Sequence, residues 1–390
     1  MIEITSKDRC SGCYACANAC PKECIKMISD DEGFWYPQLD MKKCIDCGLC
    51  EKVCPIINKW EPEESRVTKA MAAINKIEEI RLKSSSGGMF TLIAELIINQ
   101  GGVVFGAAFS DDFKSVHHIS VDNTYDLEKL RGSKYTQSRI GNTYKQAKEY
   151  LESGRKVLFT GTPCQIGGLY SYLKKQYNNL YTQDIICHGV PSPMVWKKYV
   201  EEREKEYSAK TKQIYFRNKK SGWKSYSISF DFVNNKEYMK VHREDSFMRA
   251  FLSDVCLRQS CSNCSFKNIT RQSDLTLADF WGIQNVLPEM DDDKGTSLVL
   301  VHSKKGHELL EKIEHLMITK PVNIDCVIKY NPSVVTSVSS NQLREKYMKR
   351  IKTESPDYLA SKLFKMSLKN RIKSILRRLG IISMLKKLRN

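Results

Sequence analysis

The sequence predicts an α+β ferredoxin-like domain with two iron–sulfur clusters, then a larger α/β domain and a basic helical tail. Three observations support this division. Nine of the fifteen cysteines lie within residues 1–58. Residues 66–345 alternate short β-like runs with amphipathic stretches, and residues 346–390 are rich in lysine and arginine. At 390 residues the chain is long enough for two or three domains.

The composition favours a folded protein of the cytoplasm. Hydrophobic residues make up 41% of the chain, yet no run approaches the roughly eighteen apolar residues that a membrane span needs. The first ten residues lack a basic segment followed by an apolar one, so we expect no secretory leader. In a reducing compartment, the cysteines of a large chain favour metal ligation over disulfides.

The formal net charge of +17 does not by itself indicate nucleic-acid binding. A [4Fe-4S] core with four thiolates contributes −2, so three such sites would lower the charge to about +11. Ten lysines and arginines and no acidic residue lie in residues 358–390, so much of the remaining charge is local. We therefore predict no nucleic-acid partner.

Eight cysteines form two copies of a cluster-binding motif, C-x2-C-x2-C-x3-C-P. In this pattern three thiolates of a short loop bind one cubane, and the fourth cysteine binds the other cubane. We therefore assign cluster I to Cys10, Cys13, Cys16 and Cys54, and cluster II to Cys44, Cys47, Cys50 and Cys20. Zinc sites usually offer paired C-x2-C units rather than runs of four. Cys24 falls outside the pattern, and we interpret it as a small buried residue.

The larger domain repeats the order strand, tight loop, helix. Residues 101–109 are an apolar run that follows a helix-like stretch opening at Ser84. Two later apolar runs end in Gly/Pro loops that contain Cys164 and Cys187. This order is typical of an α/β fold, in which ligands bind at the carboxyl ends of strands.

Four cysteines of the larger domain are candidates for a third cluster. Cys164 and Cys187 lie in strand-end loops, and Cys261 and Cys264 form a C-x2-C pair. Together they would supply a tetrahedral set of thiolates. From the residues alone, buried free cysteines are an equal alternative.

Taken together, these motifs resemble the beta subunit family of coenzyme F420 hydrogenase/dehydrogenase, in the bacterial form fused to a ferredoxin domain. Besides the ferredoxin motifs, the matching stretches are residues 83–88, 131–135, 161–165, 187–193, 261–264 and 274–282. They run in order and are specific in combination.

The resemblance implies an iron–sulfur flavoprotein that passes electrons between clusters, FAD and coenzyme F420 or another acceptor. It also implies that the third [4Fe-4S] cluster is bound by Cys164, Cys187, Cys261 and Cys264. Cys256 is a nearby competitor as ligand, and we interpret Cys326 as structural. Bacterial members are often encoded beside surface-polysaccharide genes, which suggests a role in polysaccharide metabolism.

The resemblance favours an FAD pyrophosphate at the small residues Ser84, Ser85, Ser86, Gly87 and Gly88. Small residues at a helix start leave N–H groups and hydroxyls for a phosphate, although an ordinary N-cap is the alternative. Lys134 could neutralise a phosphate or stabilise reduced flavin. A solvated surface charge is the alternative for a lone lysine.

The tail has apolar residues at steps of three or four among basic residues between positions 369 and 389. This pattern predicts a basic amphipathic helix. It could pack on the domain, lie on an anionic membrane surface, or dock to an acidic protein. A membrane contact would place the protein at the inner face of the membrane.

Two functions are compatible with these features. The first is a flavin-dependent oxidoreductase that moves electrons from the ferredoxin clusters through the third cluster and FAD to a substrate or deazaflavin. The second is a non-catalytic electron-transfer subunit that docks a separate catalytic partner. Both need a redox partner protein or a small electron carrier. We assign no catalytic residue, and we interpret His188 as a loop anchor.

Overall fold

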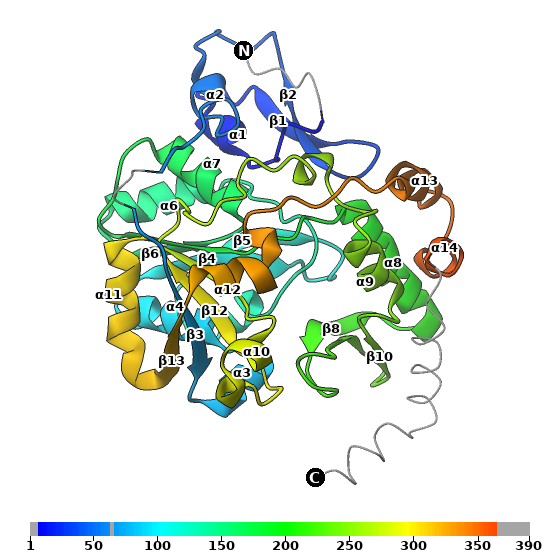
Figure 1. Ribbon diagram of the computed structural model, residues 1–390. Helices are drawn as coiled ribbons and strands as arrows, with labels where there is room; N and C mark the ends of the chain where they lie inside the picture. Colours follow the sequence, from blue (N-terminus) through cyan, green and yellow to red (C-terminus); the bar gives the residue numbers. More distant parts are fainter. Residues whose placement is uncertain (1–6, 63–65, 365–390) are drawn as a thin grey trace.

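The computed structural model describes residues 7–62 and 66–364, which form a ferredoxin domain, a body with an eight-stranded sheet, and a side lobe (Figure 1). The predicted order of a ferredoxin-like domain and an α/β domain is confirmed, with a mixed sheet in the latter. The helix predicted at 369–389 lies outside the described residues. No helix within the described ranges is long and apolar enough to cross a bilayer.

The ferredoxin domain has two similar halves. Its elements are α1 (Ala15–Ala19), β1 (Ile25–Ser29), β2 (Trp35–Leu39) and α2 (Leu49–Lys52). The two strands pair antiparallel. Each helix begins inside a cysteine run, after a left-handed residue: Tyr14 (φ 69°) before α1 and Gly48 (φ 68°) before α2. The same turn in both halves follows from the repeated cysteine spacing.

The body is built on one sheet with the strand order β13-β3-β12-β11-β7-β6-β4-β5. Four neighbouring strands are parallel: β4 (Val103–Phe109), β6 (Val157–Thr160), β7 (Leu180–Ile185) and β11 (Leu275–Asp279). The others pair antiparallel with their neighbours: β3 (Lys69–Asn75), β5 (Val116–Val121), β12 (Ser297–Val301) and β13 (Met317–Val322). The parallel strands place their carboxyl ends along one edge.

Helices cover both faces of this sheet. Val157 and Phe159 of β6 pack with α6 (Thr143–Glu152) and α7 (Pro163–Leu173) on one face. Leu158, between them, packs on the other face with α4 (Met89–Asn99) and α11 (Lys304–Ile313). Alternating side chains of a strand point to opposite faces, so apolar runs such as 157–159 fill two cores. Shorter helices complete the body: α3 (Glu78–Lys83), α5 (Leu127–Leu130), α10 (Ile283–Val286) and α12 (Ile324–Tyr330).

A side lobe, which the sequence analysis did not separate, has its own antiparallel sheet and aromatic core. It contains α8 (Pro193–Tyr207), β8 (Thr211–Asn218), β9 (Ser227–Phe232), β10 (Glu237–Val241) and α9 (Ser246–Leu252). Two further helices, α13 (Leu343–Arg350) and α14 (Pro356–Leu363), bring Tyr347, Ile351 and Leu359 into the same core. The first part of the predicted tail therefore packs on the lobe.

One arginine links the ferredoxin domain to the rest of the chain through hydrogen bonds. The guanidinium of Arg258 is fully buried and donates to Cys10 O at 2.8 Å, Trp35 O at 3.1 Å and Gln137 Oε1 at 3.2 Å. It also lies 4.1 Å from the centre of the Tyr36 ring. A charged donor with three acceptors is a strong and directional link.

Other contacts hold the ferredoxin domain against both body and lobe. Glu32 accepts two hydrogen bonds from the Arg344 guanidinium, at 3.0 and 2.5 Å. Trp35 belongs to the body core beside α6 and α7, whereas Phe34 belongs to the lobe core. The neighbouring residues of one hairpin thus anchor in two different cores, which fixes the orientation of the domain.

We expect Arg258→Met to loosen the ferredoxin domain. The change leaves two buried carbonyls and an amide without their charged donor, each such bond being worth about 1.5–3 kcal/mol. The midpoint of urea unfolding should fall, and protease cleavage of residues 1–58 should accelerate. Arg350→Met is the control, because Arg350, the last residue of α13, pairs with Glu354 beyond the helix end at 2.6 Å and 29% exposure, and such a partly exposed pair is worth under about 1 kcal/mol. Equal effects of both changes would contradict this role of Arg258.

Candidate functional site

The structure brings Cys54, from the second cysteine run, next to the first run. Cys13 and Cys16 are buried, and the electrostatic neighbours of both include Cys10 and Cys54. Burial raises the pKa of the Cys13 thiol to about 12. Such thiols become good ligands when a bound metal removes their protons. This is the arrangement that the assignment to cluster I requires.

The four cysteines assigned to cluster II also gather around one pocket. Its lining includes Cys20, Cys44, Cys47 and Cys50. Cys24 lines the pocket too, and its Sγ lies 3.2 Å from Cys20 Sγ. We interpreted Cys24 as a small buried residue. It is buried, and the structure adds that the start of β1 carries it to the pocket, which its spacing did not reveal.

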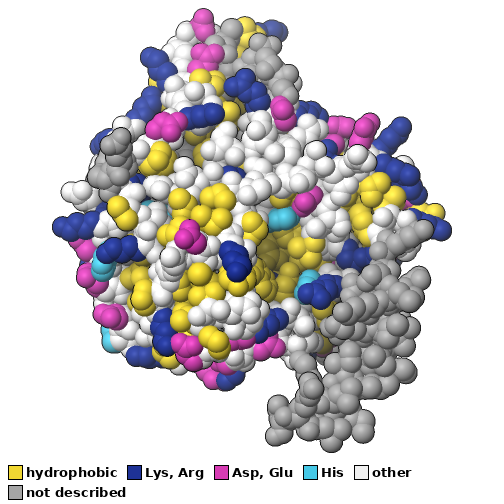
Figure 2. Space-filling view, in the orientation of Figure 1, with side chains coloured by type: hydrophobic (Ala, Val, Ile, Leu, Met, Phe, Trp, Pro, Cys, Tyr) yellow, Lys and Arg dark blue, Asp and Glu magenta, His cyan; other side chains and the backbone are white. Residues whose placement is uncertain are grey.

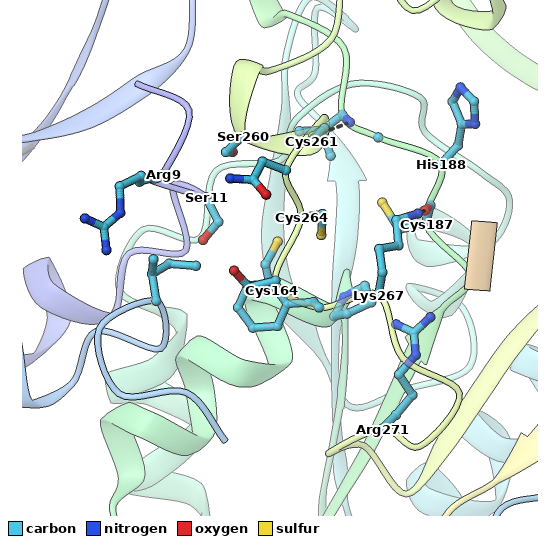
Figure 3. Close-up of a pocket in the computed structure, with 17 residues that line it drawn as sticks. Arg9, Ser11, Cys164, Cys187, His188, Ser260, Cys261, Cys264, Lys267 and Arg271 are labelled. Atoms are coloured by element: carbon cyan, nitrogen blue, oxygen red, sulfur yellow. Dashed lines mark hydrogen bonds between the residues drawn. The ribbon is translucent and has the colours of Figure 1, made fainter. Parts of the chain in front are cut away.

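A further pocket, at the junction of the ferredoxin domain and the body, gathers the four cysteines predicted for a third cluster (Figure 3). Cys164 is the second residue of α7, and Cys187 follows β7. Cys261 ends the short 3-10 turn Gln259–Cys261, and Cys264 comes three residues later. Ser11 of the ferredoxin domain lines the same pocket. Residues distant in sequence thus meet at the carboxyl edge of the parallel strands.

The donor set of this pocket suits an iron–sulfur cluster. Burial raises the pKa of Cys187 and of Cys261 to about 12, and that of Cys164 further. An all-thiolate set selects soft metals, either zinc or iron–sulfur clusters. Val190 N donates to Cys261 Sγ at 3.5 Å, an interaction that stabilises cluster sulfurs. Within the described ranges, no three His, Cys, Asp or Glu side chains group closely enough to hold a single ion.

Three other candidates lie apart from these thiols. Cys256 is buried in the lobe core and does not line the pocket, and Cys326 lies in α12. His188 lines the pocket, but its ring points away from the cysteines (Figure 3). Its Nε2 lies 2.6 Å from Asp254 Oδ1, in keeping with a loop anchor.

Helix α7 links the third set of cysteines to the first cysteine run. It carries Cys164 in its first turn and Gly168 about one turn later. A Cβ atom at Gly168 would lie 2.9 Å from Cys13 Cβ and 3.1 Å from Cys13 Sγ. Cys13 is also an electrostatic neighbour of Cys164. The small residue therefore lets the ferredoxin cysteines approach the helix that begins at the third pocket.

The loop 84–88, predicted to hold the FAD pyrophosphate, links α3 to α4 beside the start of β12. Gly87 N donates to Ser297 Oγ at 2.9 Å, and a Cβ at Gly87 would lie 2.4 Å from Ala73 O. Ser84 Oγ and Ser86 Oγ donate to backbone carbonyls of α3 and the β12 entry. Ser85 Oγ accepts from Ser133 N at 2.8 Å. All three serine hydroxyls therefore have partners within the fold, and Gly88 (φ 87°) starts α4.

Two lysines with partly buried side chains flank this loop. Lys134 Nζ donates to Arg131 O at 3.0 Å and Gly132 O at 3.3 Å, and burial lowers its pKa to about 7. Lys219 Nζ donates to the carbonyls of Ser86, Lys294 and Arg81, at 2.7, 2.7 and 2.8 Å. Burial also lowers the pKa of Lys219 to about 7, although three donated bonds require the ammonium form. Neither has a carboxylate at ion-pair distance in the part of the chain that the structure describes. The sequence analysis missed Lys219.

The stretch 274–282 lies next to the loop 84–88, because Asp279 pairs with Ser297 in the sheet. Asp279, at the end of β11, accepts from Arg217 Nη2 at 3.0 Å and Trp223 Nε1 at 2.8 Å. The Trp223 and Trp281 rings stack with centroids 5.0 Å apart. Figure 2 shows that the surface is hollowed between the body and the lobe, with hydrophobic side chains inside the hollow.

Two segments match known families. Residues 154–323 match the family defined by the C-terminal part of the beta subunit of coenzyme F420 hydrogenase/dehydrogenase. Residues 9–56 match the 4Fe-4S dicluster domain.

Individual relatives cover parts of the chain. An uncharacterized protein of Methanocaldococcus jannaschii is 25% identical over 200 residues, 44% of this chain and 54% of that protein. NADH-quinone oxidoreductase subunit I 2 of Geobacter metallireducens is 39% identical over 56 residues, 13% of this chain and 43% of that one. The chain thus spans about half the length of these relatives. A chain of the F420-reducing [NiFe] hydrogenase complex of Methanosarcina barkeri superposes with a TM-score of 0.48 and 16% identity, covering 70% of this chain and 92% of that one.

Proposed function

We propose that this chain, which belongs to the coenzyme F420 hydrogenase/dehydrogenase beta subunit family, passes electrons from two ferredoxin clusters through a third [4Fe-4S] cluster to FAD. The observation that carries the proposal is the position of α7, which carries Cys164 in its first turn and packs through Gly168 against Cys13. Electron transfer between centres needs a short separation, and the contact of α7 with Cys13 supports one between the third set of cysteines and the first run. The ligands would be the twelve cysteines assigned above.

The FAD pyrophosphate would bind at residues 84–88. Three observations support this: the loop lies at a helix start, Lys134 lies beside it, and Lys219 holds the carbonyl of Ser86. Partial burial of an ammonium is unfavourable without an anion nearby, and a pyrophosphate would supply one. Lys134 would contact the cofactor, whereas Lys219, with its donors already used, would position the loop.

Flavins exchange single electrons with clusters and electron pairs with substrates. The final acceptor in this proposal is therefore a substrate or the deazaflavin coenzyme F420, in a cytoplasmic reduction that serves polysaccharide metabolism. Electrons would enter from a redox partner protein or small carrier at the ferredoxin domain, where Cys47 is exposed. The alternative function is a non-catalytic subunit whose body docks a separate catalytic partner.

We expect about twelve irons per chain after anaerobic reconstitution, because three cubanes are proposed. Cys261→Ala should lower the content to about eight. Cys256→Ala is the matched control, because Cys256 is a nearby cysteine outside the pocket, and it should keep about twelve. The iron and sulfide contents of the unmodified chain, Cys261→Ala and Cys256→Ala are measured side by side. About eight irons in the unmodified chain, unchanged in Cys261→Ala, would remove the third cluster.

Reconstituted protein should release FAD when it is denatured. Lys134→Gln should weaken FAD binding roughly tenfold to a hundredfold, the value of one charged hydrogen bond, whereas Lys304→Gln, at a 91% exposed side chain, should not. Since the pKa of Lys134 is lowered to about 7, its charge is present at pH 6 and falls as pH rises through 7. FAD affinity of the unmodified chain should therefore fall between pH 6 and 8, and that of Lys134→Gln should change less. Fully loaded protein without flavin would favour the non-catalytic subunit.

The basic segment after residue 364 would bind anionic membranes. Deleting residues 365–390 should abolish flotation with anionic vesicles, since each basic residue near such a surface contributes about 1 kcal/mol. The deletion starts there because Leu359 and Ala360 are buried. Binding should weaken with salt, which screens charges beyond about 8 Å at physiological strength, and should be absent with neutral vesicles. A full-length chain that ignores anionic vesicles at low salt would refute membrane association.

A further inference from the structure

Lys267 places an ammonium group in the wall of the third pocket. It follows Cys264 by three residues, and Figure 3 shows its side chain reaching toward Cys187. Its Nζ donates to Cys187 O at 2.5 Å and to Ser333 O at 2.7 Å. The side chains of Cys187, Cys264 and Cys261 lie close enough to interact electrostatically with this ammonium.

This ammonium lacks a protein counter-ion. Among the described residues, no carboxylate lies within ion-pair distance of Lys267. The adjacent Arg271 is buried, and its nearest carboxylate, Asp184, is 3.7 Å away. The Nε of Arg271 has no hydrogen-bond partner in the described part of the chain. His188 faces Asp254 instead of the pocket. Arg271 is ion-paired with Asp184, whereas Lys267 has no carboxylate partner among the described residues, so this wall keeps a net positive charge.

A bound cluster would supply the negative charge that balances this positive wall. An oxidised cubane with four thiolates carries a formal −2 charge, and one added electron makes it −3. A fixed cation in a region of low dielectric stabilises the more negative state more strongly. Net charge and hydrogen bonding around the sulfurs set the potential of such clusters. The cation wall therefore favours the reduced form of a cluster bound here.

Around the ferredoxin cysteines, the described residues supply no partly buried lysine comparable to Lys267. The electrostatic neighbours of the buried Cys13 and Cys16 are other cysteines. Lys22, which lines the pocket of the cluster II cysteines, is exposed, so water screens its charge. Arg258 lies between the two regions: it donates to Cys10 O and is an electrostatic neighbour of Cys261. The charge of Arg258 therefore acts both on the first cysteine run and on the third set, and it favours neither.

We propose that Lys267, with Arg271 beside it, raises the reduction potential of the third cluster above those of the two ferredoxin clusters. This inference rests on the proposed function and gives it a direction. One electron leaves a reduced ferredoxin cluster, which goes from −3 to −2, and the third cluster goes from −2 to −3. No bond forms or breaks, and no proton is needed. Electrons that enter at the ferredoxin domain would then accumulate on the third cluster, next to the body.

The test is a redox titration of the full-length, anaerobically reconstituted chain, followed by electron paramagnetic resonance. The signal that is missing in Cys261→Ala identifies the third cluster. In the unmodified chain this cluster should be reduced first. Lys267→Gln keeps an N–H donor but removes the charge, and it should lower the midpoint potential of this cluster alone. Lys267→Arg keeps the charge and should stay close to the unmodified value. Lys304→Gln should shift none.

Iron analysis separates the possible failures. About eight irons in the unmodified chain would remove the third cluster, and with it the proposed function. With about twelve irons, a ferredoxin cluster that is reduced first, or an unshifted potential in Lys267→Gln, overturns this inference alone. Loss of the cluster in both Lys267 variants also overturns it, because the side chain would then serve only its two carbonyl contacts. Loss of the cluster in Lys267→Gln alone supports a pairing of the Lys267 charge with the cluster. The order in which the clusters of the unmodified chain are reduced then decides whether this inference holds.

Discussion

The relative position of the cysteine sets depends on one buried side chain, Arg258. The Arg258 guanidinium donates to the carbonyl of Cys10. The backbone N–H of Arg258 donates to Val190 O, and its backbone carbonyl accepts from Cys261 N, each at 3.0 Å. The residue therefore links a ferredoxin ligand loop, the loop after Cys187 and the turn that carries Cys261. A charged donor buried among carbonyls is costly to displace. The ferredoxin domain is thus held in one orientation, as an electron path between domains requires.

The parallel strands supply the second constraint. Because β6, β7 and β11 run in the same direction, the loops after them lie at one edge. Cys164 and Cys187 meet there, and Asp279 ends β11 at the same edge. The Ser/Gly loop joins the same edge through Ser297 of β12, which pairs with Asp279 of β11. The cysteine pocket and the loop 84–88 therefore lie at the same edge of the sheet because of strand direction, although their residues come from distant parts of the sequence.

This explains what could be predicted from the sequence. The ferredoxin ligands follow from local spacing, and Cys164 and Cys187 follow from the strand-then-loop order. The contact of Cys24 with Cys20 depends on where β1 begins, and the role of Lys219 depends on carbonyls of Arg81 and Lys294, more than seventy positions away. No local pattern marks such residues. The packing of Tyr347 and Leu359 on the lobe was also missed, because the basic composition of that segment hides a short apolar stripe.

Three lysines would couple the stability of the fold to the proposed cofactors. Lys134, Lys219 and Lys267 donate to backbone carbonyls, and none of them has a carboxylate at ion-pair distance in the described ranges. Burying a cation is unfavourable unless an anion compensates it. In the proposed function, the pyrophosphate compensates Lys134, and the cluster compensates Lys267. Ligands that bind the folded state stabilise it by mass action. The charges that make the empty chain less stable are then the same charges that select its cofactors, so binding and folding are coupled through these side chains.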